Sequence, residues 1–296
     1  MDTSLEKRRS RAEYKTDGGY GGGVQTMVRT MKKTILRPVR NITAVLTLIC
    51  FMLPAAPGQE TTEEKIRTLF EEAVAAMGGD AYIDVRDIVS EGQYFVFNNR
   101  GDSSGLIKFV DYTRLPDKSR FELGNKKNEL EITIFDLAKN EGWIIEGERE
   151  AKAATEDDIK SFWAAANHSL ENILRFRWKE PQNKLFYLGA GEGADVTRDL
   201  VRLIDPSNDE VVVYFDRVSK LPVKVEFQRI NERGVRVRVV DEYSQWHRIQ
   251  GVLTPMRIDS YTNGRRSSQQ FFLKLSYNNN LRDDLFSKPA QKTKKR

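Results

Sequence analysis

The sequence predicts a mainly β protein of the α+β class with roughly a dozen antiparallel strands. Between residues 210 and 286, apolar and polar side chains alternate with a period of two, as in Val235-Arg236-Val237-Arg238-Val239, and this pattern is typical of strands with one buried face. Turn residues such as Asn263-Gly264 separate the alternating segments, and this pair tolerates the positive φ of a tight hairpin. No strand-helix-strand alternation is present, so nothing favours a parallel sheet.

The first half of the fold is predicted to begin with an amphipathic helix. Thr61 or Thr62 is a candidate cap, apolar side chains recur at helical spacing from Ile66 to Met77, and Gly78-Gly79 end the pattern. Short strands separated by turn residues follow at 83–89, 93–97, 107–112, 119–123, 129–135 and 143–146. Segment 93–97 is apolar on both faces, which places it either between a helix and a lined interior or within an ordinary core.

A helical segment over 155–177 interrupts the strands. Thr155 is a candidate cap with acidic residues in the first turn behind it, and Ile159, Phe162, Trp163 and Ala166 form an apolar stripe. Such helices either cover an open sheet as a lid or complete its core, and the sequence leaves both interpretations open. Strands resume at 185–188 and 200–204 and lead into the alternating segments of 210–286.

The basic charge of the chain is concentrated near its N-terminus. The formal net charge is +5, but residues 1–58 hold ten of the 48 Lys and Arg and four of the 43 Asp and Glu, which leaves 38 basic and 39 acidic residues for the remainder. A nearly neutral body presents no broad positive surface for phosphate backbones. Nucleic acid is therefore excluded as a predicted partner.

Residues 31–58 have the features of a signal peptide. Basic residues from Lys32 to Arg40 precede a twelve-residue apolar run at 42–53 and a small-residue cleavage site ending at Gly58. Twelve helical residues cover about 18 Å against roughly 30 Å of hydrocarbon, so a cleaved signal and a periplasmic location are favoured over an N-terminal anchor in the inner membrane. We interpret 1–30 as a disordered, mis-assigned start, 59–288 as the folded domain and 289–296 as a disordered basic tail.

Few residues are suited to catalysis or metal binding. The single cysteine, Cys50, lies in the apolar run, so the exported chain has no thiol nucleophile, disulfide or thiolate metal site. The two histidines, His168 and His247, are not part of any metal-binding motif, and we expect packing roles for both. No catalytic residue, metal or cofactor is predicted, and an enzyme would require a cleft that brings carboxylates to one of these histidines.

Large aromatic side chains are the most prominent candidates for a ligand site. Pockets for apolar ligands are lined in this way, although an ordinary core uses the same residues. The candidates for an apolar cavity are Tyr94, Phe97, Phe109, Phe121, Trp143, Phe162, Trp163, Phe186, Tyr214 and Phe227.

Several short motifs, taken in order over residues 61–288, resemble the LolA/LolB-like superfamily, in particular its outer-membrane lipoprotein-sorting group. They are the helix near 63–77, Leu-Pro-Asp-Lys-Ser-Arg-Phe-Glu at 115–122, Glu-Gly-Trp at 141–143, Phe-Asp-Arg-Val-Ser-Lys-Leu-Pro at 215–222, Gly-Val-Leu-Thr-Pro at 251–255 and Asn-Leu-Arg-Asp-Asp-Leu-Phe at 280–286. The chain departs from the family by its length, by Glu-Gly-Trp in place of Asp-Gly before the aromatic residue, and by its own helical insert.

The resemblance implies a curved, unclosed antiparallel half-barrel with an N-terminal helix and a helical lid over a cavity for acyl chains. Arg120 is nearest to the family's early-strand basic residue and is the polar contact candidate. The implied function is a periplasmic, monomeric carrier or binding protein for an acyl chain or lipoprotein, without catalysis, whose partners include transport components of the inner or outer membrane. The alternative is a non-catalytic structural or interaction module of the envelope, in which the sheet is packed solid.

Overall fold

The computed structural model describes residues 60–98, 100–103, 105–231 and 234–289. All of them belong to one compact unit, Pro57–Arg296. The predicted start and signal peptide, 1–30 and 31–58, lie outside the described residues, as does the predicted tail from residue 290 onward.

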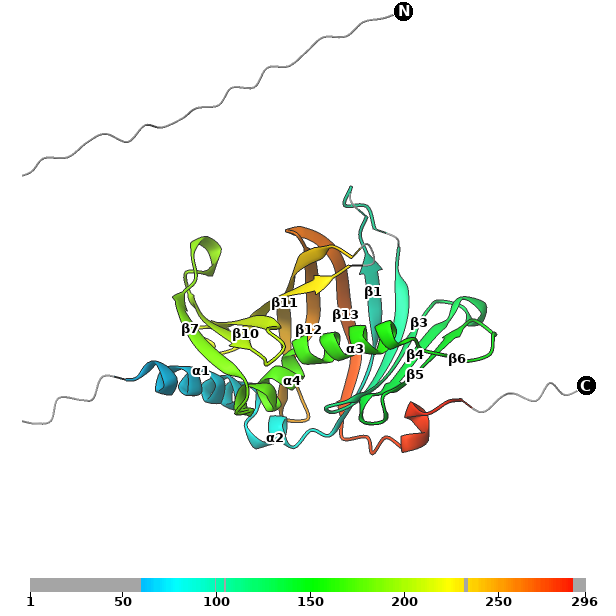
Figure 1. The fold of residues 1–296 in the computed structure, drawn as a ribbon, viewed down its shortest axis with the longest axis horizontal. Helices are drawn as coiled ribbons and strands as arrows, with labels where there is room; N and C mark the ends of the chain where they lie inside the picture. The colour runs from blue at the N-terminus through cyan, green and yellow to red at the C-terminus, as the bar shows by residue number, and fades with distance from the viewer. Residues whose placement is uncertain (1–59, 99, 104, 232–233, 290–296) are drawn as a thin grey trace, which may run out of the picture. The chain divides into compact units, whose positions relative to one another are not determined.

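The fold is a single antiparallel sheet of 13 strands that does not close, accompanied by four α-helices among the described residues (Figure 1). This confirms the predicted fold class. The strands are β1 (Asp87–Val96), β2 (Ile107–Arg114), β3 (Lys118–Leu123), β4 (Glu131–Asp136), β5 (Glu141–Glu146), β6 (Lys152–Ala153), β7 (Lys184–Ala190), β8 (Arg198–Ile204), β9 (Glu210–Asp216), β10 (Pro222–Ile230), β11 (Arg236–Ile249), β12 (Val252–Thr262) and β13 (Arg265–Tyr277). The helices are α1 (Thr62–Met77), α2 (Asp80–Ile83), α3 (Glu156–His168) and α4 (Leu170–Arg175).

The strand order explains where the sheet is open. It runs β6-β5-β4-β3-β2-β1-β13-β12-β11-β10-β9-β8-β7, so all sequence neighbours except β6 and β7 pair, and the first strand pairs with the last. The two edges are therefore β6 and β7, which are consecutive in the chain. The segment between them contains α3 and α4, and α3 crosses the concave side of the sheet in Figure 1. We call the α3–α4 segment the strap.

The predicted helix starts are confirmed by their capping contacts. Thr61 and Glu64 form a capping box at the start of α1, and Thr155 and Asp158 form another at the start of α3, which satisfies backbone N–H groups that a helix leaves free. Gly78 ends α1 with φ 134°, and a Cβ there would lie 2.7 Å from the backbone oxygen of Gly251. Only glycine fits this position without a shift of backbone.

The predicted break between strands at 83–89 and 93–97 is wrong. Residues 87–96 form one strand, β1, and Asp80–Ile83 form the short helix α2. Gly92 suggests a turn in the sequence, but it lies at a β-bulge, where a Cβ would fall 2.0 Å from the backbone oxygen of Phe271 and 2.6 Å from the Phe109 ring. Because Gly92 has no Cβ, atoms of the neighbouring strands can lie close to it while β1 continues.

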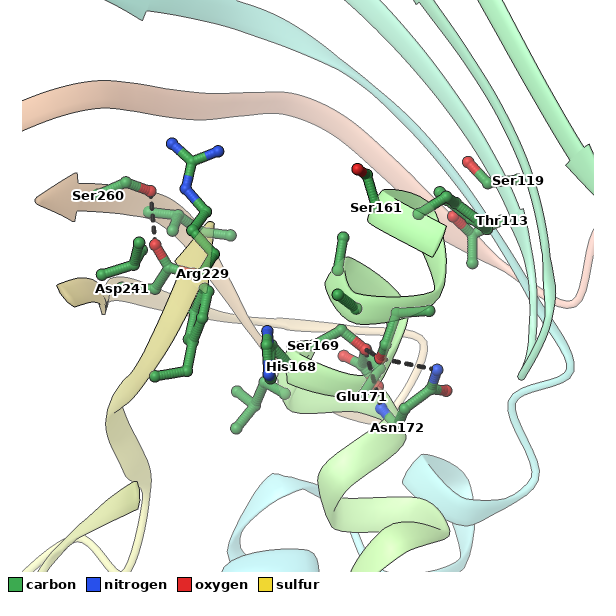
Figure 2. Close-up of a pocket in the computed structure, with 18 of the residues that line it drawn as sticks. Thr113, Ser119, Ser161, His168, Ser169, Glu171, Asn172, Arg229, Asp241 and Ser260 are labelled. Carbon is green, nitrogen blue, oxygen red and sulfur yellow. Dashed lines mark hydrogen bonds between the residues drawn. The ribbon is translucent and has the colours of Figure 1, made fainter. Parts of the chain in front are cut away.

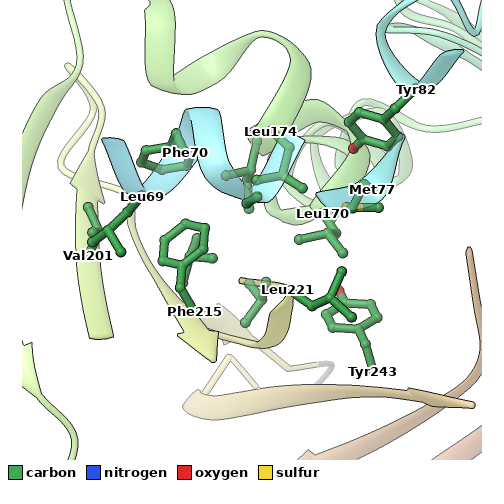
Figure 3. Close-up of a cluster of buried hydrophobic side chains, with 14 of the residues drawn as sticks. Leu69, Phe70, Met77, Tyr82, Leu170, Leu174, Val201, Phe215, Leu221 and Tyr243 are labelled. Atoms are coloured by element: carbon green, nitrogen blue, oxygen red, sulfur yellow. The ribbon is translucent and has the colours of Figure 1, made fainter. Parts of the chain in front are cut away.

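One end of the concave face is packed solid by α1 and α4 (Figure 3). Phe70 of α1 is fully buried, stacks on Trp178 with ring centroids 4.9 Å apart, and meets the edge of the Phe215 ring at 5.1 Å. Leu174 of α4 and Val201 of β8 are also fully buried in this cluster. Each such side chain contributes about 1.5–3 kcal/mol by leaving water.

The C-terminal segment is fastened to the start of β1. The buried carboxylate of Asp87 accepts hydrogen bonds from the backbone N–H of Asn279 at 2.6 Å and of Leu281 at 3.1 Å. Beyond it, Phe286 is buried against Ile134 and Ile145 on the other face of the sheet. The end of the chain thus covers part of the face that the strap does not.

Candidate ligand-binding cavity

A cavity of about 1740 Å³ lies between the strap and the concave face of the sheet (Figure 2). Its sheet wall comes from β1, β2, β3 and β10 to β13, and its other wall comes from α3 and the start of α4. The same sheet is therefore filled at one end, under α1 and α4, and hollow at the other, under α3.

The strap leaves this space because several of its cavity-lining side chains are small. Ser161, Ala164, Ala165 and His168 line the cavity and recur at the three- and four-residue spacing of one helix face. Phe162 also borders the cavity, but its ring stacks on Phe135 with centroids 4.4 Å apart. That contact holds α3 to β4 and keeps the bulkier ring at the rim of the space.

The sheet wall combines aromatic rings with hydroxyl groups. Phe121, Phe227 and Phe272 supply apolar surface, whereas Ser90, Thr113, Ser119, Ser260 and Ser268 supply donors and acceptors. Such a mixed lining suits a ligand that has both an apolar body and polar groups.

Six carboxylic acids line the cavity, and two of them, Asp111 and Asp241, lie within strands of the sheet wall and have raised pKa values. The other four are Asp157, Glu171, Asp209 and Glu210. Asp111 of β2 accepts hydrogen bonds from the Thr113 hydroxyl at 3.3 and 3.2 Å, and burial raises its pKa to about 7. Asp241 of β11 accepts a bond from the Ser260 hydroxyl at 2.6 Å (Figure 2). Burial raises the pKa of Asp241 as well, although the Ser260 bond and the charges of His168 and Arg229 oppose the shift.

His168 fixes the C-terminal end of α3. Its Nε2 lies 2.7 Å from a carboxylate oxygen of Asp209, and its ring stacks on Phe227 with centroids 4.2 Å apart. The side chain is buried, and among the contacts of the described residues no hydroxyl group hydrogen-bonds to it. These contacts match the packing role expected for His168.

Four of the predicted cavity residues line the space and a fifth lies beside it. Tyr94, Phe121, Phe162 and Phe227 border the cavity. Phe109 is buried next to it, stacked on Phe121 at 5.7 Å and in edge contact with Phe272 at 5.7 Å.

The other predicted aromatic residues lie elsewhere. Trp143 packs with Phe286, and Tyr214 donates its hydroxyl proton to Glu226 at 2.8 Å, in both cases on the face opposite the cavity. Phe186 and Trp163 are each 45% exposed and do not border the cavity. Phe97 lines a second, smaller pocket of about 320 Å³ near a hairpin loop.

Arg120 also differs from its expected position. It alternates along β3 with the cavity-lining Ser119 and Phe121, so it points to the other face, where its Nε donates to Glu122 at 2.7 Å. The period of two that identifies a strand does not say which face is concave. Asp111 and Asp241 were missed for the same reason, since polar residues in a strand suggest the wet face. The position of Asp111 two residues after Phe109 is the signal that indicates an inward side chain.

An unclosed antiparallel sheet with a helical segment across its concave side defines an open half-barrel with helices. No group of three or more His, Cys, Asp and Glu side chains that could hold a metal ion occurs among the described residues. In the same part of the chain, no helix has the length and apolar character required to cross a membrane.

Comparison with solved structures confirms the predicted resemblance at the level of the fold. A LolA superfamily protein from Nitrosomonas europaea superposes with a TM-score of 0.50 at 13% identity, over 75% of this chain and 97% of that one. A DUF1329 family protein from Desulfovibrio piger gives 0.49 at 11% identity, over 75% and 97%. A domain provisionally assigned to outer membrane lipoprotein sorting, from Vibrio parahaemolyticus, gives 0.47 at 11%, over 75% and 95%. No family model and no curated protein sequence matches the chain.

Proposed function

We propose that this protein is a carrier or binding protein for an acyl chain, a lipoprotein or a similar amphiphilic ligand, which it holds between the concave sheet and the strap without catalysing a reaction. The observation that carries the proposal is the cavity of about 1740 Å³. Its volume exceeds the roughly 300–1,000 Å³ of ordinary small-molecule pockets. The LolA-type fold supports the same class of function.

The cavity also bears on the alternative, a structural module of the envelope with a solid core. In a structural module, side chains that filled the space under α3 would add stability, because each buried CH₂ group contributes about 0.8 kcal/mol. An unfilled space is therefore not expected of such a module.

We further propose that the folded domain is 59–288, that it acts as a monomer, and that the segment 31–58 directs it to the periplasm, where it meets transport components of the inner or outer membrane.

Uptake of a fluorescent acyl lipid with an uncharged head group tests the function. The purified, delipidated protein should take up this lipid with a fluorescence increase, and Phe121→Asp, which places a charge in the cavity wall, should weaken uptake about tenfold or more. Trp163→Asp is the matched control, because Trp163 is exposed on α3 outside the cavity, and it should change uptake less than about twofold. A folded protein that takes up no lipid, or equal losses in the two variants, would contradict the proposal.

A further inference from the structure

Asp111 has an unusual environment for a carboxylate. Its direct neighbours across the strands are Ser90 on β1 and Phe121 on β3, and neither is charged. None of the ion pairs among the described residues includes Asp111, and its hydrogen bonds are the two long ones from Thr113. Burying an ionised acid without a cation is costly, so a cationic group of a ligand in the cavity would stabilise the ionised form of Asp111.

Aromatic rings lie near Asp111 in the cavity wall. Phe121 is its direct neighbour on β3. Phe109, two residues before Asp111 on β2, stacks on Phe121 and meets Phe272 edge-on, each at 5.7 Å, and both Phe121 and Phe272 line the cavity. Ring faces attract cations, and a carboxylate among ring faces is the arrangement that accommodates an alkylammonium group.

Asp241 provides the contrast within one cavity. It accepts a short hydrogen bond from Ser260, and electrostatic interactions with His168 and Arg229 lower its pKa. The pKa of Asp111, by comparison, responds to burial and to Thr113 alone, and it rises to about 7. None of the basic residues that line the same cavity acts on the pKa of Asp111. These residues are Lys118, Lys160, His168, Arg229 and Arg236.

We propose that the cavity selects amphiphiles that carry a protonated amine, and that Asp111 is the residue that binds the ammonium group while the apolar chain occupies the space under α3. This inference rests on the proposed function and names its ligand class. The shared chemistry is an amine close to an acyl chain, which an aminophospholipid or a lipopeptide with a free N-terminus can supply.

Displacement of the neutral fluorophore N-phenyl-1-naphthylamine by three twelve-carbon compounds tests the selectivity. At pH 8, where Asp111 is ionised, dodecylamine should displace the dye at about tenfold to a hundredfold lower concentration than dodecanol, since a charge-assisted hydrogen bond replaces a neutral one. Dodecanoate should be the weakest of the three, because its charge repels the carboxylate.

Two matched variants test whether Asp111 causes the preference for dodecylamine. Asp111→Asn keeps the size and the Thr113 contact, and it should bring dodecylamine to within about threefold of dodecanol. Asp241→Asn should retain the preference. Equal displacement by amine and alcohol in the parent protein, or a preference that survives Asp111→Asn, overturns the inference while leaving the carrier function standing. Failure of all three compounds to displace the dye overturns both.

The natural source of the amine is a separate comparison. Phosphatidylethanolamine vesicles and micelles of a diacylated lipopeptide with a free N-terminus are each tested beside an N-acetylated counterpart. Preference for the free amine in either pair supports the inference and identifies the source. No preference in both pairs contradicts it.

Discussion

The two ends of the concave face are made from one sheet and differ in what the helices bring to it. At the filled end, α1 presents Leu69, Phe70 and Met77, all buried. At the hollow end, α3 presents Ser161, Ala164 and Ala165. Packing to the density of an organic crystal needs side chains that fill the gap, and those of α3 are too small. The volume of a helix face therefore decides whether this sheet makes a core or a cavity.

The strands also differ between the two ends, with apolar side chains at the filled end and polar ones at the hollow end. Under α1 and α4 the strands contribute Val201, Val213 and Phe215, which are fully or almost fully buried. Under α3 they contribute Asp111 and Ser260 to the cavity wall. Polar groups are tolerated in that wall because the cavity leaves room for water or a ligand to satisfy them.

Deleting a ring from each end should give the largest difference. Phe70→Ala should lower the free energy of unfolding by about 3–5 kcal/mol, because the emptied site is enclosed by Trp178 and Phe215. Phe121→Ala removes a half-buried ring from the cavity wall. It should lower the free energy of unfolding by about 1 kcal/mol or less, in addition to the loss of the ring contact with Phe109. Urea unfolding followed by circular dichroism measures both, and equal losses would show that the two ends are packed alike.

Adding a ring at each end tests the same comparison through overpacking. Ala73→Phe, at a fully buried position on α1, should destabilise the protein by about 1–3 kcal/mol through overpacking. Ala165→Phe on α3 should change stability by less than about 0.5 kcal/mol, because its ring can enter the cavity, and it should reduce lipid uptake. If Ala165→Phe destabilises as much as Ala73→Phe, the space under α3 is not available to a side chain.

The smallest effect concerns pH. The folded pKa of Asp111 is about 7 and its unfolded value is about 3.9, so the folded state binds the extra proton between these pH values and stability from this group falls as pH rises from about 4 to 7. The full pKa shift corresponds to a change in stability of about 4 kcal/mol. Because the Asp111 carboxyl group faces the cavity, we expect a smaller change of about 1–2 kcal/mol.

The measurement compares chemical unfolding of the parent and Asp111→Asn at pH 4.5 and pH 7.5. Asn does not titrate, so the variant should gain stability relative to the parent as pH rises. A difference that is constant with pH would mean that Asp111 is solvated like a surface carboxylate.

Much of the fold was predictable because local physics determines it. Helix α1 has its cap, its apolar face and its terminal glycine within 18 residues of sequence, from Thr61 to Gly78. The strands of residues 210–286 follow from alternation. β1 was misjudged because the reason for Gly92 is the close approach of the Phe271 backbone oxygen and the Phe109 ring, which come from other strands. A contact between strands leaves no local pattern in the sequence.

The candidate site was only partly predictable for a related reason. Alternation separates Phe121 from Arg120 and Phe215 from Tyr214, but curvature decides which set faces the cavity. The pairing of β1 with β13 and the crossing of the strap set that curvature, and both depend on contacts between residues far apart in the chain. Of the ten aromatic candidates, four therefore border the cavity, one lies beside it and five lie elsewhere.

The strand order has a consequence for a chain that is cut. Proteolytic cleavage between β6 and α3 would divide the protein into a fragment with β1 to β6 and a fragment with β7 to β13. The fragments would remain joined by the ladder from Ile88 opposite Tyr277 to Val96 opposite Ser268 and by α1, which packs on β7 and β12. We therefore expect the two fragments to associate into the same sheet when they are produced separately.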